Sequence, residues 1–522
     1  MSVRGLFGLP SEAGSSSTNA GTFAIFGQYQ ITPAWSDGRP LVGPGNRSQP
    51  DFSSGWTRPR TTAREAGIGL NGVSWRRVPR IGVDTARAWY QAASYLAAAW
   101  MPRAVSRLPR SGAPHVVLLA RHLPPTITGG VYRPLALMNE AERRGWRITA
   151  LSGPTLGAPS AAGVELRNRL PASARLVNWK WSPLDVSRRV SPTLDGGFTT
   201  IHAIIDAALS SSQGEPPDLI HATGPTFAEF VAAMVLARHW RIPYSLDYRD
   251  EWSESPFTFV HHGNSDRFWE RRVLAHASLV TFTTEAQRDH QLKAFPDLDR
   301  GITAVVGNGW DEEAAKGAGH HAGEAHPDRA TVAYLGNLGQ HCDVPEFLAT
   351  LRGAFVARAD LKGRIAIDFV GIKSDVERRL LSSFHEPEVL RDLPQVPLTA
   401  AQAMMRRSSA LLLFNPPLLA RYIPGKAYEY IATGKRILLY GEGGELDRLL
   451  SDYPAAIRVH RGDATGLSGA LSLIATSNGE GGADPTLVDR YSRRRRAAEQ
   501  ADMLDRLIAV SRENEAASPP RG

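Results

Sequence analysis

The chain has 522 residues, of which 42% are hydrophobic and 21% are charged. This length and composition predict a soluble protein of at least two domains, and they exclude a wholly disordered chain, a collagen and a disulfide scaffold. The single cysteine, Cys342, excludes an internal disulfide and a cysteine-rich zinc site. The sequence shows no apolar run of the transmembrane type and no apolar core of a secretory signal, so we expect a cytoplasmic protein.

The formal net charge of +8 lies at one end of the chain. Residues 1–110 contain 13 arginines, no lysine and 5 acidic residues, and the rest of the sequence is neutral. A neutral body argues against nucleic acid as a ligand, because a phosphate backbone needs a basic face. The basic extension instead predicts contact with an anionic membrane surface or an acidic partner, and hence a peripheral position at the inner face of the plasma membrane.

Residues 1–110 are expected to form a partly irregular N-terminal extension. Residues 1–80 are rich in Gly, Pro, Ser and Arg and show no sustained periodicity. Residues 83–101, ahead of Pro102, predict an alanine-rich helix that is apolar on most sides. Its Trp and Tyr residues and the flanking arginines leave two interpretations open, a helix in the membrane interface or a helix packed on the protein.

From residue 115, short apolar runs alternate with helical stretches such as 131–144 and 226–240. This alternation is typical of a parallel sheet covered by helices on both faces. It predicts an N-terminal Rossmann-like domain over residues 111–315. Its strands are expected at 115–119, 147–151, 219–221, 244–247, 279–282 and 304–306.

The polar stretch from Asp311 to Arg329 predicts a linker, after which the alternation restarts. A second Rossmann-like domain is expected over residues 325–485, and a closing helix and tail over 486–522. In that helix, Arg493 to Arg496 are interpreted as a solvated face. Strands of the second domain are expected at 332–336, 365–371, 410–414, 437–440 and 457–459. The predicted fold class is therefore α/β, with two doubly wound domains facing across a cleft.

Ligands of such sheets bind at the carboxyl ends of the strands, so the loops there are the candidate sites. Gly129 and Gly130 follow the first strand and precede a helix, where paired glycines let a backbone approach an anion; a simple tight turn is the alternative. Histidine pairs occur at 261–262 and 320–321, but neither has ligand spacing with a third partner. We therefore expect no bound metal.

Five segments in order resemble family 4 glycosyltransferases of the GT-B fold, over about residues 114–510. They are LPPTITGGVYRPLALMNEAERRGWRITAL, PDLIHATGPTFAEFVAAMVLARHWRIPYSLDYRDEW, VVGNGWDEEA, VAYLGNLGQHCDVPEFLATL and FNPPLLARYIPGKAYEYIATGKRILLYGEGGEL. The resemblance implies a nucleotide-sugar donor in the C-terminal domain and an acceptor in the N-terminal domain. It implies no bound cofactor, and it does not extend to residues 1–110.

By this resemblance, Glu429 matches the second glutamate of the E-x7-E motif and would bind the ribose hydroxyls of the donor. Its alternative is an ordinary first-turn glutamate favoured by the helix dipole. Lys426, three residues earlier, would neutralise the donor diphosphate, or else pair with Glu429. Gly336 belongs to the same predicted donor site.

The sequence departs from the family pattern at three positions. Arg421 stands where the first glutamate of E-x7-E would fall, and Asn337 and Asp343 stand near the usual basic residues. Lys426 and Arg421 are then the expected contacts of the diphosphate. On the acceptor side, His221 is expected at a strand end pointing into the cleft, with a structural role as the open alternative. Asp247, Arg249 and Asp250 follow another strand and suit sugar hydroxyls, with a self-neutralising ion network as the alternative.

The implied function is transfer of a sugar, with retention, to a hydroxyl of a glycan or lipid-linked acceptor in surface polysaccharide or glycolipid synthesis. His221, Asp250 and Lys426 are the candidate catalytic residues. Two alternatives stay open. One is a catalytically silent binding or scaffold subunit, which the departures favour, and the other is a sugar-nucleotide epimerase of the same fold.

Overall fold

The computed structural model describes residues 112–155, 158–180, 198–212, 215–257, 264–312, 329–339, 342–476 and 485–517, with the single residues 96, 260 and 482. The extension over residues 1–110 and its predicted helix at 83–101 lie outside these residues, apart from Leu96. None of the helices within the described ranges is both long and apolar enough to cross a membrane.

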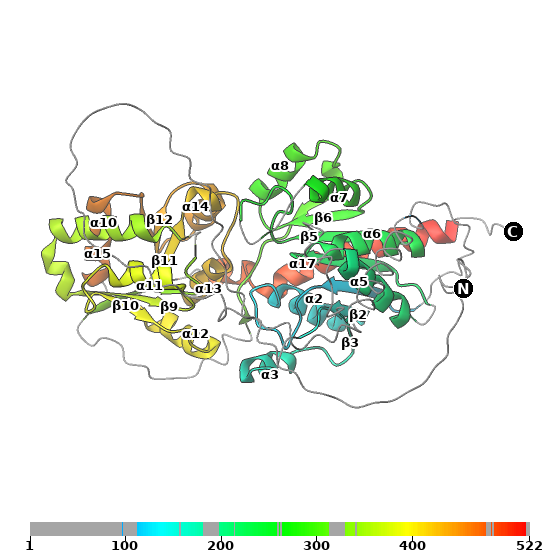
Figure 1. Cartoon of the computed structure of the whole chain (residues 1–522), viewed down its shortest axis with the longest axis horizontal. Helices are drawn as coiled ribbons and strands as arrows, with labels where there is room; N and C mark the ends of the chain where they lie inside the picture. Colours follow the sequence, from blue (N-terminus) through cyan, green and yellow to red (C-terminus); the bar gives the residue numbers. More distant parts are fainter. Residues whose placement is uncertain are drawn as a thin grey trace, which may run out of the picture. The chain divides into compact units, whose positions relative to one another are not determined.

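The first domain contains a parallel sheet in the order β3-β2-β1-β4-β5-β6-β7 (Figure 1). Its strands are β1 (His115–Ala120), β2 (Arg147–Ser152), β3 (Arg175–Asn178), β4 (Leu219–Gly224), β5 (Tyr244–Tyr248), β6 (Leu279–Phe282) and β7 (Thr303–Val305). The β1–β4 register runs from Val116 opposite Leu219 to Ala120 opposite Thr223. The order in which strands are added to the sheet reverses between β1 and β4, which is where sheets of this type open a ligand crevice.

Alternate residues of β1 face two different cores, as the period of a strand requires. Val117 and Leu119 lie in one core with helices α5 (Phe198–Ser211), α6 (Ala228–Trp240) and α7 (Asn264–Leu274). Val116 and Leu118 lie in the other with α2 (Tyr132–Arg143) and the C-terminal helix α17 (Arg493–Ala517). The remaining helical segments of this domain are α3 (Ala161–Arg167), α8 (Glu285–Ala294) and η2 (Arg300–Ile302).

The second domain repeats the design with the order β10-β9-β8-β11-β12-β13. Its strands are β8 (Ala330–Leu335), β9 (Ile365–Val370), β10 (Leu390–Leu393), β11 (Ala410–Asn415), β12 (Arg436–Gly441) and β13 (Ala456–Val459). Its helices are α10 (Val344–Ala357), α11 (Asp375–Ser382), α12 (Leu398–Arg407), α13 (Gly425–Thr433), α14 (Gly444–Ser451), α15 (Ala464–Thr476) and α16 (Pro485–Arg490), with η3 (Ala359–Gly363) and η4 (Pro417–Leu419). Its two cores lie on opposite faces of the sheet.

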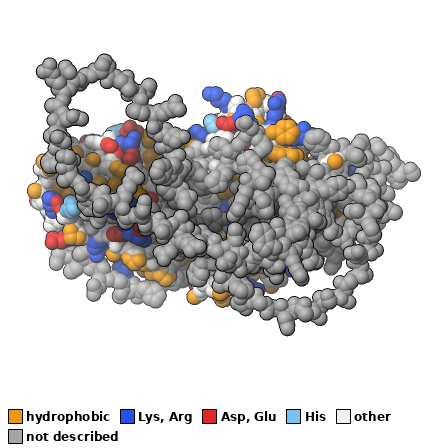
Figure 2. All heavy atoms as spheres, in the orientation of Figure 1, with side chains coloured by type: hydrophobic (Ala, Val, Ile, Leu, Met, Phe, Trp, Pro, Cys, Tyr) orange, Lys and Arg blue, Asp and Glu red, His pale blue; other side chains and the backbone are white. Residues whose placement is uncertain are grey.

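The fold class predicted from the sequence is confirmed, since both sheets are parallel and doubly wound. Two strands were not predicted, β3 and β10, because each lies at a sheet edge and lacks an apolar run. The predicted closing helix is divided at Tyr491 and Ser492 into α16 and α17. Charged side chains of both signs mix with apolar ones over the described surface that Figure 2 leaves uncovered, in keeping with a neutral body.

Candidate functional site

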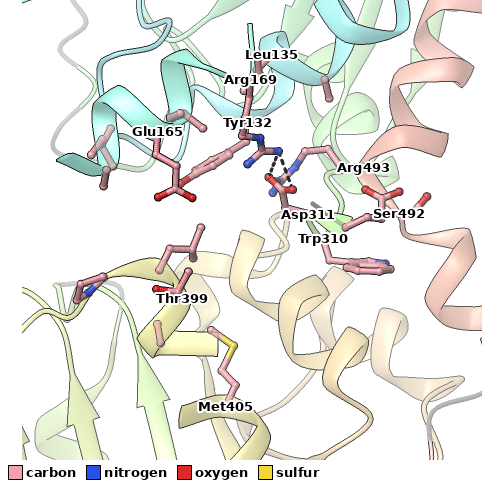
Figure 3. A pocket seen from close by; sticks show the side chains of 18 of the residues that line it. Tyr132, Leu135, Glu165, Arg169, Trp310, Asp311, Thr399, Met405, Ser492 and Arg493 are labelled. Carbon is pink, nitrogen blue, oxygen red and sulfur yellow. Dashed lines mark hydrogen bonds and ion pairs between the residues drawn. The ribbon is translucent and has the colours of Figure 1, made fainter. Parts of the chain in front are cut away.

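A cavity of about 1570 Å³ lies at the carboxyl ends of both sheets. Tyr132, Glu165 and Arg169 belong to one wall, and Thr399 and Met405 belong to the facing wall (Figure 3). Trp310, Asp311 and Arg493 line the side where the chain passes between the two domains. This volume exceeds that of a typical small-molecule site, so the cavity has room for two substrates.

Lys426 lies in the first turn of α13, directly beside the end of β8. A Cβ added to Gly336 would come 2.9 Å from Lys426 Nζ, so the absence of a side chain at Gly336 makes room for the ammonium. Nζ lies 3.7 Å from the centre of the Tyr334 ring. Burial lowers the pKa of Lys426 to about 8, although Cys342 opposes the shift. Within the described part of the chain, Lys426 has neither a hydrogen bond nor an ion pair.

The start of α13 adds to this positive potential. The residue before the helix is Pro424, and no side chain caps the first turn, which also lacks an acidic residue. The unpaired backbone N–H groups of a helix start attract anions, and they do so more strongly beside a lysine. Gly434, with φ of 70°, ends the helix in the left-handed conformation that favours glycine.

Glu429 lies one turn after Lys426, and the two side chains do not pair. Its Oε1 accepts a hydrogen bond from the Asp311 amide at 3.3 Å and lies 3.5 Å from Arg493 Nη2. Burial raises the pKa of Glu429 to about 7, with Arg493 opposing and Asp311 reinforcing the shift. The first turn of α13 holds no acidic residue, so the interpretation of Glu429 as an ordinary first-turn glutamate is wrong.

Gly336 and Asn337 both line the cavity, and their contact with a donor stays a prediction. Gly336 has φ of 129° and Gly371, at the end of β9, has φ of 140°. A Cβ on Gly371 would come 2.2 Å from the Gly336 carbonyl oxygen. The ends of β8 and β9 can therefore approach each other closely only because both residues are glycines, and the missing side chains leave space in the cavity.

Gly129 and Gly130 lie in the loop between β1 and α2, beside the cavity-lining residues Ile127 and Tyr132. Arg249 holds this loop, because it donates to the carbonyl oxygens of Gly130 at 2.5 Å and of Gly224 and Pro225 at 2.7 Å. A Cβ on Gly130 would collide with the guanidinium, which explains the glycine. Arg249 is thus occupied by the backbone, and the prediction that it binds the acceptor has no support from this geometry.

The expectation that His221 ends a strand and points into the cleft is wrong. The strand β4 continues to Gly224, and His221 is 1% exposed in its middle. Its Nδ1 lies 2.7 Å from Ser245 Oγ and its Nε2 lies 3.3 Å from Gln500 Nε2. Burial lowers the pKa of His221 to about 4, so the ring is neutral at pH 7. These contacts give it a structural role.

Asp247 is also enclosed, and it is 1% exposed. It accepts two hydrogen bonds at 2.8 Å from the buried Arg133, with Thr223 and Thr281 as further donors. Burial alone would raise the pKa of Asp247, but the charge and hydrogen bonds of Arg133 outweigh it and hold that pKa well below its usual range. This matches the alternative interpretation as a self-neutralising ion pair.

Asp250 is half-buried after β5 and accepts no hydrogen bond from the residues that the structure describes. Burial raises its pKa, while Arg249 opposes the shift. His122, which the sequence did not single out, directly follows Arg121 after β1. Burial, then the charges of Arg121 and Arg249, lower its pKa to about 4. A contact between Asp250 and the acceptor stays a prediction.

Arg421 does not lie at the donor site. It donates to Glu251 Oε1 at 2.9 Å through Nε and to Oε2 at 2.6 Å through Nη2. Glu251 is fully buried and also accepts from the Tyr422 hydroxyl at 2.7 Å. The prediction that Arg421 binds the diphosphate is therefore corrected, because an ion pair between the domains occupies its guanidinium.

Arg493 is the main site residue that the sequence interpretation missed. It lines the cavity, pairs with Asp311 at 3.0 Å and lies over the Tyr132 ring at 4.9 Å. Its interpretation as part of a solvated face is wrong. The helix α17 begins at the crossing, by which we mean residues 309–311 and 491–493, where the chain passes between the domains. Asp311, expected in a linker, is 4% exposed and also pairs with Arg169 at 2.8 Å. Among the described residues, no cluster of side chains has the composition of a metal site.

The model of the glycosyl transferase 4-like domain matches residues 128–309. Among solved structures, sucrose-phosphate synthase from Thermosynechococcus elongatus is similar over 76% of this chain and 100% of its own, with 14% identity and a TM-score of 0.57. An Anabaena protein in complex with UDP covers 75% of this chain and 99% of its own, with 14% identity and a TM-score of 0.51.

An E. coli structure described as trehalose-6-phosphate, bound with UDP-2-fluoro glucose, covers 78% of this chain and 100% of its own, with 16% identity and a TM-score of 0.51. No curated protein gives a significant sequence match. At these identities the solved structures show the fold. The chain thus has the GT-B fold, and its residues 128–309 match the model of the glycosyl transferase 4-like domain.

Proposed function

We propose that the protein transfers a sugar from a nucleotide-sugar to a hydroxyl of a glycan or lipid-linked acceptor, with retention of configuration, in surface polysaccharide or glycolipid synthesis. The observation that carries this proposal is Lys426. A half-buried ammonium without an anionic partner in the described residues lies at a helix start and beside the glycine end of β8. Such a place suits a diphosphate, and the similar structures named above include complexes with UDP and with UDP-2-fluoro glucose.

In this proposal the second domain holds the donor. Lys426 and the first N–H groups of α13 face the diphosphate and stabilise the charge that it gains as the sugar leaves. Glu429, as a carboxylate, accepts hydrogen bonds from the ribose hydroxyls. Gly336 and Asn337 leave room for the diphosphate at the end of β8. The side chains supply the positive charge themselves, so we expect transfer to persist in the presence of a metal chelator.

The acceptor faces the wall formed by the first domain. Tyr132, Glu165 and Arg169 present a hydroxyl, a carboxylate and a guanidinium to the cavity, groups that suit the hydroxyls of a sugar. Asp250, whose pKa burial raises, is the candidate that would accept the proton of the attacking hydroxyl. Asp250→Asn should then lower turnover while nucleotide affinity is kept.

A thermal-shift screen against UDP-, GDP-, ADP- and dTDP-sugars tests the donor site. Losing a charge-assisted contact costs about 1.5–3 kcal/mol, so Lys426→Ala should weaken nucleotide-sugar binding roughly 10- to 100-fold. Lys435→Ala, which removes the lysine just past the end of α13, is the matched control. Stabilisation by none of these nucleotide-sugars would contradict the proposal.

A second candidate is a nucleotide-sugar-binding subunit without turnover. It is favoured by Arg421, which is committed to Glu251, and by the uncharged or acidic side chains at Asn337 and Asp343. Transfer and binding separate the two candidates. A nucleotide-sugar that binds through Lys426, yet releases no nucleoside diphosphate with a mixture of glycan and lipid-linked acceptors, would establish the silent subunit.

We further propose that residues 1–110 hold the protein at the inner face of the plasma membrane. The support is their sequence alone, with 13 arginines against 5 acidic residues. Co-sedimentation with vesicles of phosphatidylcholine and phosphatidylglycerol should decrease when residues 1–110 are deleted, and it should weaken with salt. Equal partitioning of the two proteins would contradict this proposal.

A further inference from the structure

The two chain segments that pass between the domains are bound to each other. The Trp310 amide donates to the Tyr491 carbonyl oxygen at 3.0 Å, and the Arg493 amide donates to the Trp310 carbonyl oxygen at 2.9 Å. A Cβ on Gly309 would come 2.6 Å from the Tyr491 carbonyl oxygen, so only glycine allows this approach. The paired backbones fix where the side chains of Asp311 and Arg493 begin.

Asp311 forms ion pairs with two arginines, Arg169 and Arg493. Arg169 Nη2 lies 2.8 Å from both of its carboxylate oxygens, and Arg493 Nη1 lies 3.0 Å from one of them. With 4% of its surface exposed, Asp311 forms a well-enclosed anchor for two arginines. Arg493 is thereby held with its second nitrogen, Nη2, toward Glu429.

Glu429 consequently has two partners at one carboxylate oxygen, and both belong to the segments that pass between the domains. Nη2 of Arg493 lies 3.5 Å from Oε1, and the Asp311 amide donates to the same oxygen at 3.3 Å. The guanidinium of Arg493 also lies over the Tyr132 ring, on the wall of the first domain. One side chain of α17 therefore contacts both Glu429, the candidate ribose ligand, and Tyr132 on the wall of the first domain. Figure 3 shows Arg493 beside Tyr132 and Asp311.

We infer that Arg493 is a positioning residue for the donor site, which holds the Glu429 side chain in place and in its carboxylate form for the ribose hydroxyls. The inference rests on the proposed function. A carboxylate accepts hydrogen bonds from both hydroxyls, whereas the protonated acid has to donate one. Arg493 itself is held in place by its backbone bond to Trp310 and its ion pair with Asp311.

The charged groups around Glu429 determine in which direction its pKa should change when Arg493 is removed. Arg493 and the Asp311 amide favour the carboxylate, while burial, Asp311 and Glu312 disfavour it. On the first domain, the charged Arg169 and the neutral Tyr132, whose pKa burial raises, complete the titratable surroundings. With the pKa of Glu429 at about 7, the balance is close to even at neutral pH. Removing Arg493 takes away the main opposing charge, so the carboxylate should then need a higher pH.

The test uses the full chain and nucleotide-sugars, whose diphosphate has no proton that titrates near pH 7. Binding of UDP-glucose, GDP-mannose, ADP-glucose and dTDP-glucose is measured by calorimetry between pH 5.5 and 9. For the tightest binder, affinity of the unmodified protein should fall about fivefold from pH 8 to pH 6, because Glu429 takes up a proton near pH 7 while Lys426 is already half-deprotonated at pH 8. The acid limb of this profile should have its midpoint near 7. Arg493→Ala should move this midpoint upward by about one unit, and Arg493→Lys should restore part of the shift.

Two variants serve as controls. Arg495→Ala removes a neighbouring arginine of α17 that pairs with Asp489 at the surface, and it should leave the midpoint unchanged. Glu429→Gln should abolish the acid limb with or without Arg493. A melting curve of each unliganded variant shows that it is folded.

The possible outcomes are distinct. If none of the four nucleotide-sugars binds to the unmodified protein, the proposed function and this inference are both overturned. Binding with the same midpoint in Arg493→Ala overturns the inference alone. A loss of affinity in Arg493→Ala that is equal at every pH also overturns it, because a merely structural role would act in that way.

Discussion

Replacing Arg421 by alanine should destabilise the protein without changing its affinity for nucleotide-sugars. Glu251, its partner, is fully buried and receives hydrogen bonds from Arg421 Nε and Nη2 at 2.9 and 2.6 Å. Arg421→Ala removes both of these bonds and leaves a buried carboxylate with fewer partners. Breaking a buried ion pair from one side costs about 3–5 kcal/mol, because the remaining charge is left uncompensated.

Two features of the structure reduce the loss of unfolding free energy that we expect for Arg421→Ala. Arg421 is 30% exposed, so part of its charge is already hydrated. Glu251 also keeps the Tyr422 hydroxyl at 2.7 Å and His290 Nδ1 at 3.1 Å. We therefore expect a loss of about 2–3 kcal/mol in the free energy of unfolding. Glu251→Gln should cost less, about 1 kcal/mol, because the half-exposed arginine that remains can turn to water.

Urea denaturation of the two single variants and of Glu251→Gln/Arg421→Met measures these changes. The double variant should be more stable than Arg421→Ala, since it leaves no buried charge without a partner. A cost below about 0.5 kcal/mol for Arg421→Ala would refute the reasoning about the ion pair. If Arg421→Ala instead lowered nucleotide-sugar affinity as much as Lys426→Ala does, Arg421 would have to be a contact of the donor.

Three further predictions follow from the site and its supports. Affinity for a nucleotide-sugar should rise as Glu429 ionises near pH 7 and fall as Lys426 loses its proton near pH 8, which gives a bell-shaped profile by calorimetry; a flat profile from pH 6 to 9 would contradict the two roles. Gly371→Ala should lower both the melting temperature and nucleotide-sugar affinity, because its Cβ meets the Gly336 carbonyl oxygen, whereas Gly363→Ala, with open space around it, should leave affinity intact. His221→Leu should lower the melting temperature and spare nucleotide-sugar affinity, and a variant of unchanged stability that loses sugar transfer would restore His221 to a catalytic role.

The sequence predicted the architecture well because the buried strands of a parallel sheet are apolar on both faces. Runs such as 410–414 and 279–282 are recognisable for that reason. The edge strands β3 and β10 carry charged residues on their open sides, as Arg175 and Asp392 show, and a search for apolar runs passes over them. The end of β4 was predicted too early, at His221. The strand in fact continues through Thr223 and Gly224, which are residue types common in turns.

The sequence could predict that candidate site residues lie close together only where one local segment carries them. Lys426 and Glu429 belong to a single helix, so their spacing alone brings them near each other. Arg493, Asp311 and Arg169 come from distant segments, and only the return of α17 to the first domain brings them together. The role of Arg421 was misjudged for the same reason, because its partner Glu251 is 170 residues away in the chain.

The most direct test of the donor site is a crystal structure of the full chain with the nucleoside diphosphate that stabilises it best. We expect a phosphate oxygen within hydrogen-bond distance of Lys426 Nζ and the ribose hydroxyls on the Glu429 carboxylate. The base should then lie toward Val396 and Met405 on the cavity wall. A nucleotide bound elsewhere, or one with its phosphates away from Lys426, would contradict the assignment of this site.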